Sequence, residues 1–387
     1  MTDFGGEARH RTTMLTIGNK IYTGLGHYNG AGPNILFDDW WEFDPATNAW
    51  SQKADYLGGI CYHAAGFTIG NLGYVGTGRI SPSGSVLVQD FFQYNAAQNT
   101  WQQLTDFPGT GRRGAVGFSI DGYGYIGTGS FTSDMYRYDP SSDTWTQVAD
   151  VPGGGRMSAI GFELGGEGYI GTGYRTDIGW SSTDFHKYDP TTDSWVQIDD
   201  VGIDPINGPM PRMESTGFSL NGKGYVITGV TISSGDNYKD FWEYDPATDL
   251  WTQLEDFPGT ARRYMSATTL NGCAYMGLGT NGTNFKDFWR WDLALSIVEK
   301  DLENIQFKAY PNPASDYINI SIEEFPNVSI ENLTIEVNSL LGQELYQGSL
   351  TLGENRIETQ TWQNGWYIYT ISYNDTPIKS GQISVTK

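Results

Sequence analysis

The residues best suited to catalysis or ligand binding recur at one position of a sequence repeat. A carboxylate, a hydroxyl and two basic side chains alternate there with a tyrosine and a glycine, so the set could transfer protons or bind a polar group. The residues at this position are Arg11, His63, Gly114, Ser158, Glu214 and Tyr264. Because the residue type changes from repeat to repeat, the position is a candidate for binding a ligand and not for holding the repeat together.

The position immediately before it adds more cations and aromatic rings. Its residues are His10, Tyr62, Arg113, Met157, Met213 and Arg263. Together the two positions could bind a polar ligand such as a glycan or an acidic peptide. The alternative is that these polar side chains only face water.

Motifs for catalysis or metal binding are scarce. The chain has no GxSxG, Walker or CxxC motif. Four histidines fall at different places on the repeat, without HxH or HxxxH spacing: His10, His27, His63 and His186. We therefore expect no metal and no cofactor. Glu214 with Arg11 or Arg212 could act as an acid–base pair, which keeps an enzyme as the alternative to a binding protein.

These positions belong to a unit of about fifty residues that begins six times. Five copies end in a phrase such as WEFDPATNAW (Trp41–Trp50), and a partial sixth, WRWD, begins at Trp289. Each unit predicts four strands, of which the third alternates aromatic residues and the fourth begins with tryptophan. Four-stranded units arranged radially are the blades of a β-propeller. The fold class is therefore predicted as all-β, with a six-bladed propeller.

Three other positions keep one residue type and are predicted to serve the scaffold. Tryptophan opens the fourth strand: Trp50, Trp101, Trp145, Trp195 and Trp251. Arginine begins the first strand in five units, with Cys61 in the remaining one: Arg9, Arg112, Arg156, Arg212 and Arg262. Aspartate begins the third strand: Asp39, Asp90, Asp134, Asp184, Asp240 and Asp287. We expect charge-assisted hydrogen bonds between the last two sets to hold the loops.

The unit resembles the kelch repeat, in which glycines, a later tyrosine and a tryptophan at fixed spacing mark each blade. The resemblance covers about residues 1–295, although the usual adjacent Gly-Gly is mostly Gly-x-Gly here, as at Gly76–Gly78. It implies that Arg11, His63 and their equivalents look toward the mouth of the central channel. Long, variable connections share that face, where binding is usual: 27–37, 79–88, 174–183, 199–211 and 230–239.

Some kelch propellers are enzymes, and two such activities remain alternatives. Copper oxidases similar to galactose oxidase need two histidines, two tyrosines and a thioether cysteine, and Cys61 beside Tyr62 and His63 matches part of that set. Sugar epimerases carry acidic and basic residues in the channel, for which Glu214, His63 and Arg11 are the candidates. Either would be a carbohydrate-active enzyme with its site at the channel mouth.

The sixth unit lacks a fourth strand in the sequence. Thr2-Asp3-Phe4 matches Thr105-Asp106-Phe107, the end of a fourth strand, so the N-terminus is expected to close the ring against the last blade. We expect the native protein to extend upstream of Met1, with a tryptophan just before it and a signal peptide further up.

The repeat stops near Asn304, and alternating apolar residues between turns then predict a small Ig-like β-sandwich. YPNPASDYINI (Tyr310–Ile320), the Leu-Gly-Gln at 341–343, GWYIYTI (Gly365–Ile371) and a last strand ending in lysine occur in order. This segment resembles the C-terminal sorting domain, type A, of type IX secretion substrates from Bacteroidetes. The resemblance implies export, a translocon as the partner of residues 304–387, and an extracellular or cell-surface location. The predicted domains are 1–297, a linker at 298–303, and 304–387.

Composition limits the partners. The net charge of −22 would repel nucleic acid and anionic membranes. No apolar run is long enough to span a bilayer as a helix. Two cysteines are too few for a disulfide framework and are expected to be buried thiols. We expect a monomer that binds a glycan or another surface protein.

Overall fold

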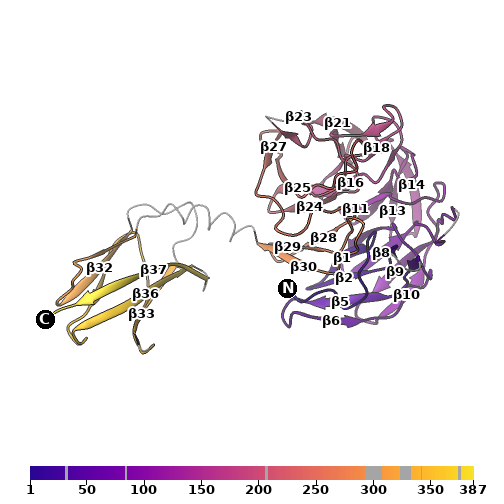
Figure 1. Ribbon diagram of the computed structural model, residues 1–387. Coiled ribbons are helices and arrows are strands. Elements are labelled where there is room, and N and C mark those ends of the chain that lie inside the picture. Colours follow the sequence, from indigo (N-terminus) through magenta and orange to yellow (C-terminus); the bar gives the residue numbers. More distant parts are fainter. Residues whose placement is uncertain are drawn as a thin grey trace. The chain divides into compact units, whose positions relative to one another are not determined.

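The computed structural model describes residues 1–30, 34–82, 85–204, 208–292, 307–322, 333–340, 342–373 and 376–387. The chain divides into two compact units, Met1–Trp291 and Asp292–Lys387, which are drawn in Figure 1. Every regular element in these ranges is a β-strand. The predicted linker at 298–303 lies outside the described residues.

The first unit is a β-propeller of six antiparallel blades, five of them four-stranded. Blade 1 contains β1 (Thr13–Ile17), β2 (Lys20–Gly24), β5 (Trp40–Asp44) and β6 (Ala49–Gln52). Blade 2 contains β7 (Ala65–Ile69), β8 (Leu72–Gly76), β9 (Phe91–Asn95) and β10 (Thr100–Gln103). Blade 3 contains β11 (Val116–Ile120), β12 (Tyr123–Gly127), β13 (Met135–Asp139) and β14 (Thr144–Val148). Blade 4 contains β16 (Ile160–Leu164), β17 (Glu167–Gly171), β20 (Phe185–Asp189) and β21 (Ser194–Ile198). Blade 5 contains β24 (Thr216–Leu220), β25 (Lys223–Ile227), β26 (Phe241–Asp245) and β27 (Leu250–Gln253). Among the described residues, blade 6 has three strands: β28 (Ser266–Leu270), β29 (Cys273–Gly277) and β30 (Phe288–Asp292).

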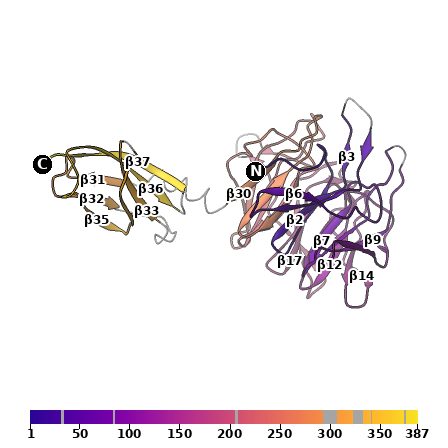
Figure 2. The ribbon, with the colours of Figure 1, turned by 90° about the horizontal axis from the view of Figure 1, so that it is seen from below.

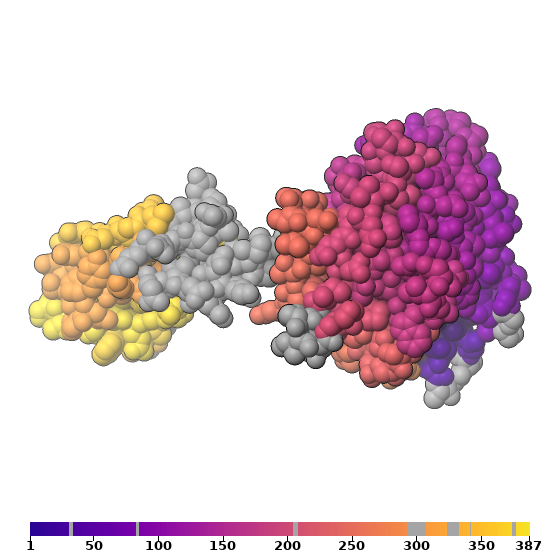
Figure 3. Space-filling view, turned by 90° about the horizontal axis from the view of Figure 1, so that it is seen from above, coloured from indigo at the N-terminus to yellow at the C-terminus, as the bar shows by residue number. Residues whose placement is uncertain are grey.

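The first strand of each blade lies innermost, and these strands form a closed ring. Each contacts the first strand of the next blade, and β28 contacts β1. In Figure 3 the blades follow one another in the colour order of the sequence. Alternate residues of these strands are buried between blades, as the period of two requires. Glycines allow the close approach, since a Cβ on Gly117 would lie 2.8 Å from the carbonyl oxygen of Gly66.

The repeated tryptophans connect neighbouring blades. Each indole N–H donates to a backbone oxygen in the previous blade: Trp101 to Ala54 at 3.0 Å, Trp145 to Thr105 at 3.0 Å, Trp195 to Ala149 at 2.9 Å and Trp251 to Asp199 at 2.9 Å. Trp50 donates in the same way to Thr2 at 3.4 Å. The N-terminal segment therefore supplies to blade 1 the contact that a fourth strand supplies to the other blades.

Phe4 anchors this segment to the last blade. Its backbone N–H donates to the oxygen of Lys286 at 2.8 Å, as that of Phe107 donates to Gln89 at 2.8 Å at the equivalent position of blade 2. The Phe4 ring is buried and packs edge-on against Trp41 and Trp50. Figures 1 and 2 both show the N-terminus beside β30. The ring is thus closed by non-covalent contacts between the two ends of the propeller.

Shortening the aromatic anchor should weaken this closure. We expect Phe4→Leu to lower the free energy of unfolding by about 1 to 2 kcal/mol, because two edge-on aromatic contacts are lost while most of the volume is kept. Chemical denaturation measures the change. Phe107→Leu, at the equivalent position inside the chain, is the control and should cost a similar amount. An unchanged stability in Phe4→Leu alone would show that the segment does not close the ring.

The repeated arginines and aspartates meet in pairs beneath the loops. The two terminal guanidinium nitrogens of each arginine, Nη1 and Nη2, donate to the two oxygens of one carboxylate: Arg9–Asp39, Arg112–Asp134, Arg156–Asp184, Arg212–Asp240 and Arg262–Asp287. The same guanidinium groups also donate to loop carbonyl oxygens, such as Thr128 from Arg112 at 3.0 Å. All five arginines are fully buried. The pairs therefore hold the connection between the second and third strands in five blades.

Short ribbons extend the connections on the same face. They contain β3 (His27–Tyr28) with β4 (Ile35–Leu36), β15 (Arg156–Met157) with β18 (Tyr174–Arg175) and β19 (Trp180–Ser181), and β22 (Ile203–Asp204) with β23 (Gly208–Pro209). Parts of the variable connections, at 31–33, 83–84 and 205–207, lie outside the described residues.

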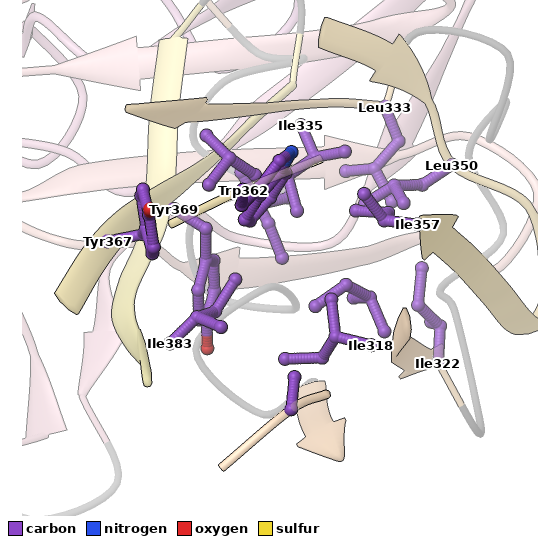
Figure 4. Packing of buried hydrophobic residues seen from close by; sticks show 14 of the residues in the cluster. Ile318, Ile322, Leu333, Ile335, Leu350, Ile357, Trp362, Tyr367, Tyr369 and Ile383 are labelled. Carbon is purple, nitrogen blue, oxygen red and sulfur yellow. The ribbon is translucent and has the colours of Figure 1, made fainter. Parts of the chain in front are cut away.

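The second unit contains two sheets, consistent with the predicted Ig-like sandwich. One has β31 (Phe307–Tyr310), β32 (Tyr317–Ile322) and β35 (Gly353–Glu358), and the other has β33 (Leu333–Ser339), β34 (Glu344–Ser349), β36 (Gly365–Tyr373) and β37 (Thr376–Val385). Figure 4 shows the core, where Ile318, Ile335 and Trp362 pack with their neighbours. In β36 the tyrosines at 367, 369 and 373 are buried, whereas Trp366 and Ile368 are exposed. This alternation is the one expected for a sheet with one face against a core.

Within the described residues, no helix has the length and apolar character needed to cross a membrane.

Candidate functional site

The chemically variable position of the repeat surrounds one end of the central channel. Its residues are left-handed, with φ of 59° at Arg11, 60° at His63, 64° at Gly114, 56° at Ser158, 61° at Glu214 and 55° at Tyr264. The expectation that they lie on the first strand is wrong: that strand starts two residues later, because a positive φ interrupts the extended backbone. The arginine and aspartate positions likewise precede their strands, except Arg156, which lies in the short strand β15.

Backbone hydrogen bonds explain why this turn is repeated. The N–H groups of His63, Gly114, Ser158, Glu214 and Tyr264 each donate to the carbonyl oxygen at the same position of the previous blade, at 2.7 to 3.2 Å. A left-handed conformation costs a non-glycine residue about 1 kcal/mol, and here the bonds between blades compensate for it. The turn therefore serves the scaffold, whereas the side chains that it displays differ.

All six residues line a cavity of about 160 Å³ at the channel mouth. A larger cavity, of about 240 Å³, lies toward the other end of the inner strands, lined by hydroxyl and apolar groups with Glu163. We assign the candidate site to the smaller cavity because the cations, rings and buried carboxylate gather there.

A hydrogen-bonded chain crosses the mouth. Arg11 Nη2 donates to the hydroxyl of Tyr264 at 2.7 Å, and that hydroxyl donates to Glu214 Oε1. Glu214 Oε2 lies 3.2 Å from Arg263 Nε. Burial raises the pKa of Glu214, although Tyr264 and the nearby arginines favour its charged form. Burial also raises the pKa of Tyr264. These hydrogen bonds thus hold the Glu214 carboxyl group, whose pKa is raised, between the guanidinium groups of Arg11 and Arg263.

Three of the four histidines meet here, so the expectation that they lie apart is wrong for His10, His27 and His63. The rings of His10 and His27 are 5.0 Å apart, and Tyr264 lies 5.6 Å from His10 and 5.2 Å from His63. The fourth, His186, lies in β20 beside Asp184. Sequence spacing could not show this convergence, because a β-bridge between residues 10 and 27 brings two blade connections together.

The arginine beside them keeps these histidines neutral. Arg11 Nη1 contacts His10 Nε2 at 2.5 Å and His27 Nδ1 at 3.4 Å, and a guanidinium can only donate. The remaining ring nitrogens then donate to Asn284 and Asn34. Burial, followed by the Arg11 cation, lowers the pKa of His10 to about 3. Burial also lowers the pKa of His27, and burial with the Arg11 and Arg113 cations lowers that of His63.

Three buried polar atoms of cavity-lining residues have no hydrogen-bond partner in the described chain: Arg11 Nε and the hydroxyl oxygens of Ser158 and Ser215. Ser158 is 4% exposed, and its hydroxyl has no hydrogen-bond partner among the described residues. The buried Nε of Arg11 is in the same condition there. Each lies on the cavity wall, where a ligand could supply the missing partner.

The adjacent position of the repeat forms the surroundings of the cavity. Tyr62 is buried, its ring stacks on His27 at 4.8 Å, and its hydroxyl lies 3.4 Å from Arg113 Nη1. None of the six residues at this position lines the cavity itself. Met157 and Met213, like His10, Tyr62 and Arg263, pair through their backbone with the second-to-third-strand connections. The sequence did not single out His27, Asn34 or Asn284. The only signal for them was their place in long, polar connections.

Cys61 lies in the arginine position of blade 2 and not on the cavity wall. It is a buried free thiol, as is Cys273. Its sulfur lies 3.5 Å from the carbonyl oxygen of Thr77, and burial raises its pKa to about 12. A thiol in this environment is unreactive. In the described ranges, no three histidine, cysteine or acidic side chains are placed to share a metal ion.

Comparisons with known proteins agree with both units. The kelch motif model matches residues 123–152, and the model of the secretion system C-terminal sorting domain matches residues 308–385. A solved structure described as "Structure of YjhT" aligns with a TM-score of 0.63 and 16% identity, over 76% of this chain and 98% of that chain. The comparison with curated proteins found no match.

The fold and the repeated motif define a kelch-type β-propeller. The C-terminal unit carries the type IX sorting domain, which indicates secretion or a cell-surface location.

Proposed function

We propose that this protein is a secreted kelch propeller that binds a glycan at the channel mouth. The observation that carries the proposal is the buried Ser158 hydroxyl, which lacks a partner in the described chain and belongs to a residue that lines the cavity with Arg11, Glu214 and Tyr264. Buried polar groups are nearly always hydrogen-bonded, so an empty partner position indicates a polar ligand. Aromatic rings beside hydrogen-bonding groups suit a sugar, whose faces are apolar and whose edges are hydroxyls.

A glycan-array screen of the whole protein tests the proposal. Binding of one glycan class without chemical change supports it. Binding only to a surface protein would instead favour the other partner expected from the sequence. Arg11→Met should abolish binding, and Glu163→Gln, at the other end of the channel, should leave it intact. If the reverse is found, the wrong end of the channel has been chosen.

Removing the unpartnered hydroxyl should separate binding from stability. We expect Ser158→Ala to weaken glycan binding about tenfold, the value of one hydrogen bond, while the free energy of unfolding stays within about 0.5 kcal/mol. Titration calorimetry and chemical denaturation give the two numbers. Ser219→Ala, in the other cavity, is the control and should change neither. A stability loss without a binding loss would contradict a ligand role for Ser158.

A sugar epimerase is the second candidate, because Glu214 combines a raised pKa with a hydrogen bond to Tyr264. A carboxyl group with a raised pKa donates a proton more readily at a given pH, because more of it is protonated, and its charged form can accept the proton back. NMR of candidate sugars incubated with the protein would reveal interconversion, and Glu214→Gln should abolish it. The copper-oxidase alternative is not proposed, because Cys61 lies off the cavity wall with a protonated thiol.

We also propose that the domains divide as the sequence indicates, with residues 304–387 recognised by a translocon. The match to the sorting domain supports this assignment.

A further inference from the structure

The channel mouth is locally positive in a strongly acidic protein. The chain as a whole carries a net charge of −22. Arg11 and Glu214 line the cavity, and Arg113 and Arg263 lie behind that wall, close enough to Glu214 to favour its charged form. The neighbouring histidines are neutral, because burial and the arginines lower their pKa values. A positive site within an acidic surface would concentrate an anion at this one place.

The repeated structural arginines differ in their partners from Arg11 and Arg113. The five structural arginines each bind an aspartate with both terminal guanidinium nitrogens. Arg11 and Arg113 have no carboxylate within ion-pair distance among the described residues. Arg11 donates to His10 and Tyr264, and Arg113 to the hydroxyl of Tyr62. A guanidinium binds a planar carboxylate through two parallel hydrogen bonds, and these two arginines have that capacity unused.

Further donors without an acceptor belong to residues that line the same cavity. Arg11 Nε and the Ser158 hydroxyl are buried, and the described chain provides no acceptor for either. Both line the cavity with His63 and Tyr264. The missing component is therefore an acceptor of hydrogen bonds with a negative charge.

The backbone at the mouth is already hydrogen-bonded, which favours a sugar over a peptide that binds as an added strand. Extended peptides that bind by strand addition need an exposed sheet edge with unpaired backbone groups. Here the N–H groups of five of the six mouth residues already donate within the ring between blades. The mouth thus offers side chains and a small cavity instead of an unpaired strand edge.

We propose that the ligand is an acidic glycan, a polysaccharide with uronate residues, whose carboxylate is bound by Arg11 and Arg113. This inference rests on the proposed glycan-binding function and assigns the chemical class of its ligand. The carboxylate accepts from the two guanidinium groups, and Ser158 donates to a sugar oxygen. Glu214 positions Tyr264 and Arg263 beside it.

Matched probes separate this inference from the proposed function. The probes are oligogalacturonate and the same oligosaccharide after reduction of its carboxyl groups, together with the neutral and acidic glycans of the array and poly-glutamate. We expect acidic glycans to bind at least tenfold more tightly than their neutral counterparts, with an affinity that falls as salt is raised. Equal or tighter binding of the neutral forms would overturn the inference and leave the proposed function standing. Absence of binding to every glycan would overturn both, and tighter binding of poly-glutamate would overturn the sugar class.

Arginine variants test which side chains bind the carboxylate of the ligand. Arg113→Met should lower the ratio of the affinities for the acidic and the reduced forms about tenfold. The control is Arg137→Met, in β13, where the guanidinium packs on Tyr123 away from the cavity. Thermal unfolding of both variants verifies that they fold. An Arg113→Met protein that keeps the full preference would overturn the assignment.

Discussion

Replacing Asp240 with alanine is expected to lower the free energy of unfolding by about 3 to 5 kcal/mol, because it leaves a buried guanidinium without its counter-charge. Arg212 is 0% exposed and binds the two oxygens of Asp240 at 2.8 and 2.6 Å. Asp240 also accepts the indole N–H of Trp242 at 2.6 Å. Denaturant unfolding monitored by tryptophan fluorescence would report the loss.

An exposed ion pair on the same blade provides the control. Lys239 and Asp256 are 3.2 Å apart, with side chains 53% and 42% exposed. Asp256→Ala should therefore cost less than about 1 kcal/mol. The double variant Arg212→Met with Asp240→Leu should recover most of the loss, since it removes both charges together. Equal losses in Asp240→Ala and Asp256→Ala would contradict a structural role for the buried pairs.

Features repeated in every blade were readable from the sequence. Tryptophans such as Trp101 and Trp195 predicted the blades because the same bond to the previous blade recurs around the ring. The variable position of the repeat was also readable, since its members come together around one cavity. Both inferences depend only on register, and register is preserved wherever the local pattern is repeated.

The side chains that surround the mouth could not be predicted from the sequence in the same way. His27 reaches Arg11 and Tyr62 through an irregular connection whose path depends on packing between blades. The left-handed turn at Ser158 and Glu214 was missed because neither residue favours that conformation by itself. Hydrogen bonds between blades stabilise this left-handed conformation, and such bonds cannot be predicted from the local sequence.

Acidification is expected to destabilise the propeller through its buried histidines. His10 is 1% exposed, and its pKa falls from 6.5 to about 3 in the folded protein. Between pH 6.5 and about 3, His10 is therefore protonated in the unfolded chain but neutral in the folded one. The stabilising contribution is complete above pH 6.5 and is lost as the pH falls toward 3, to a total of about 4 kcal/mol. His27 and His63 act in the same direction, because their pKa values are also lowered.

Unfolding free energies measured at intervals between pH 7 and 4 would show this slope, and His10→Gln should flatten it. Glu214 acts in the opposite direction. Its folded pKa is raised, so its contribution is complete at acidic pH and is lost as the pH rises through that value. Glu214→Gln should therefore make the loss on acidification steeper, which separates the two effects in one set of measurements. If His10→Gln kept the slope of the natural protein, the histidine would be protonated in the fold, and Arg11 could not be donating to it.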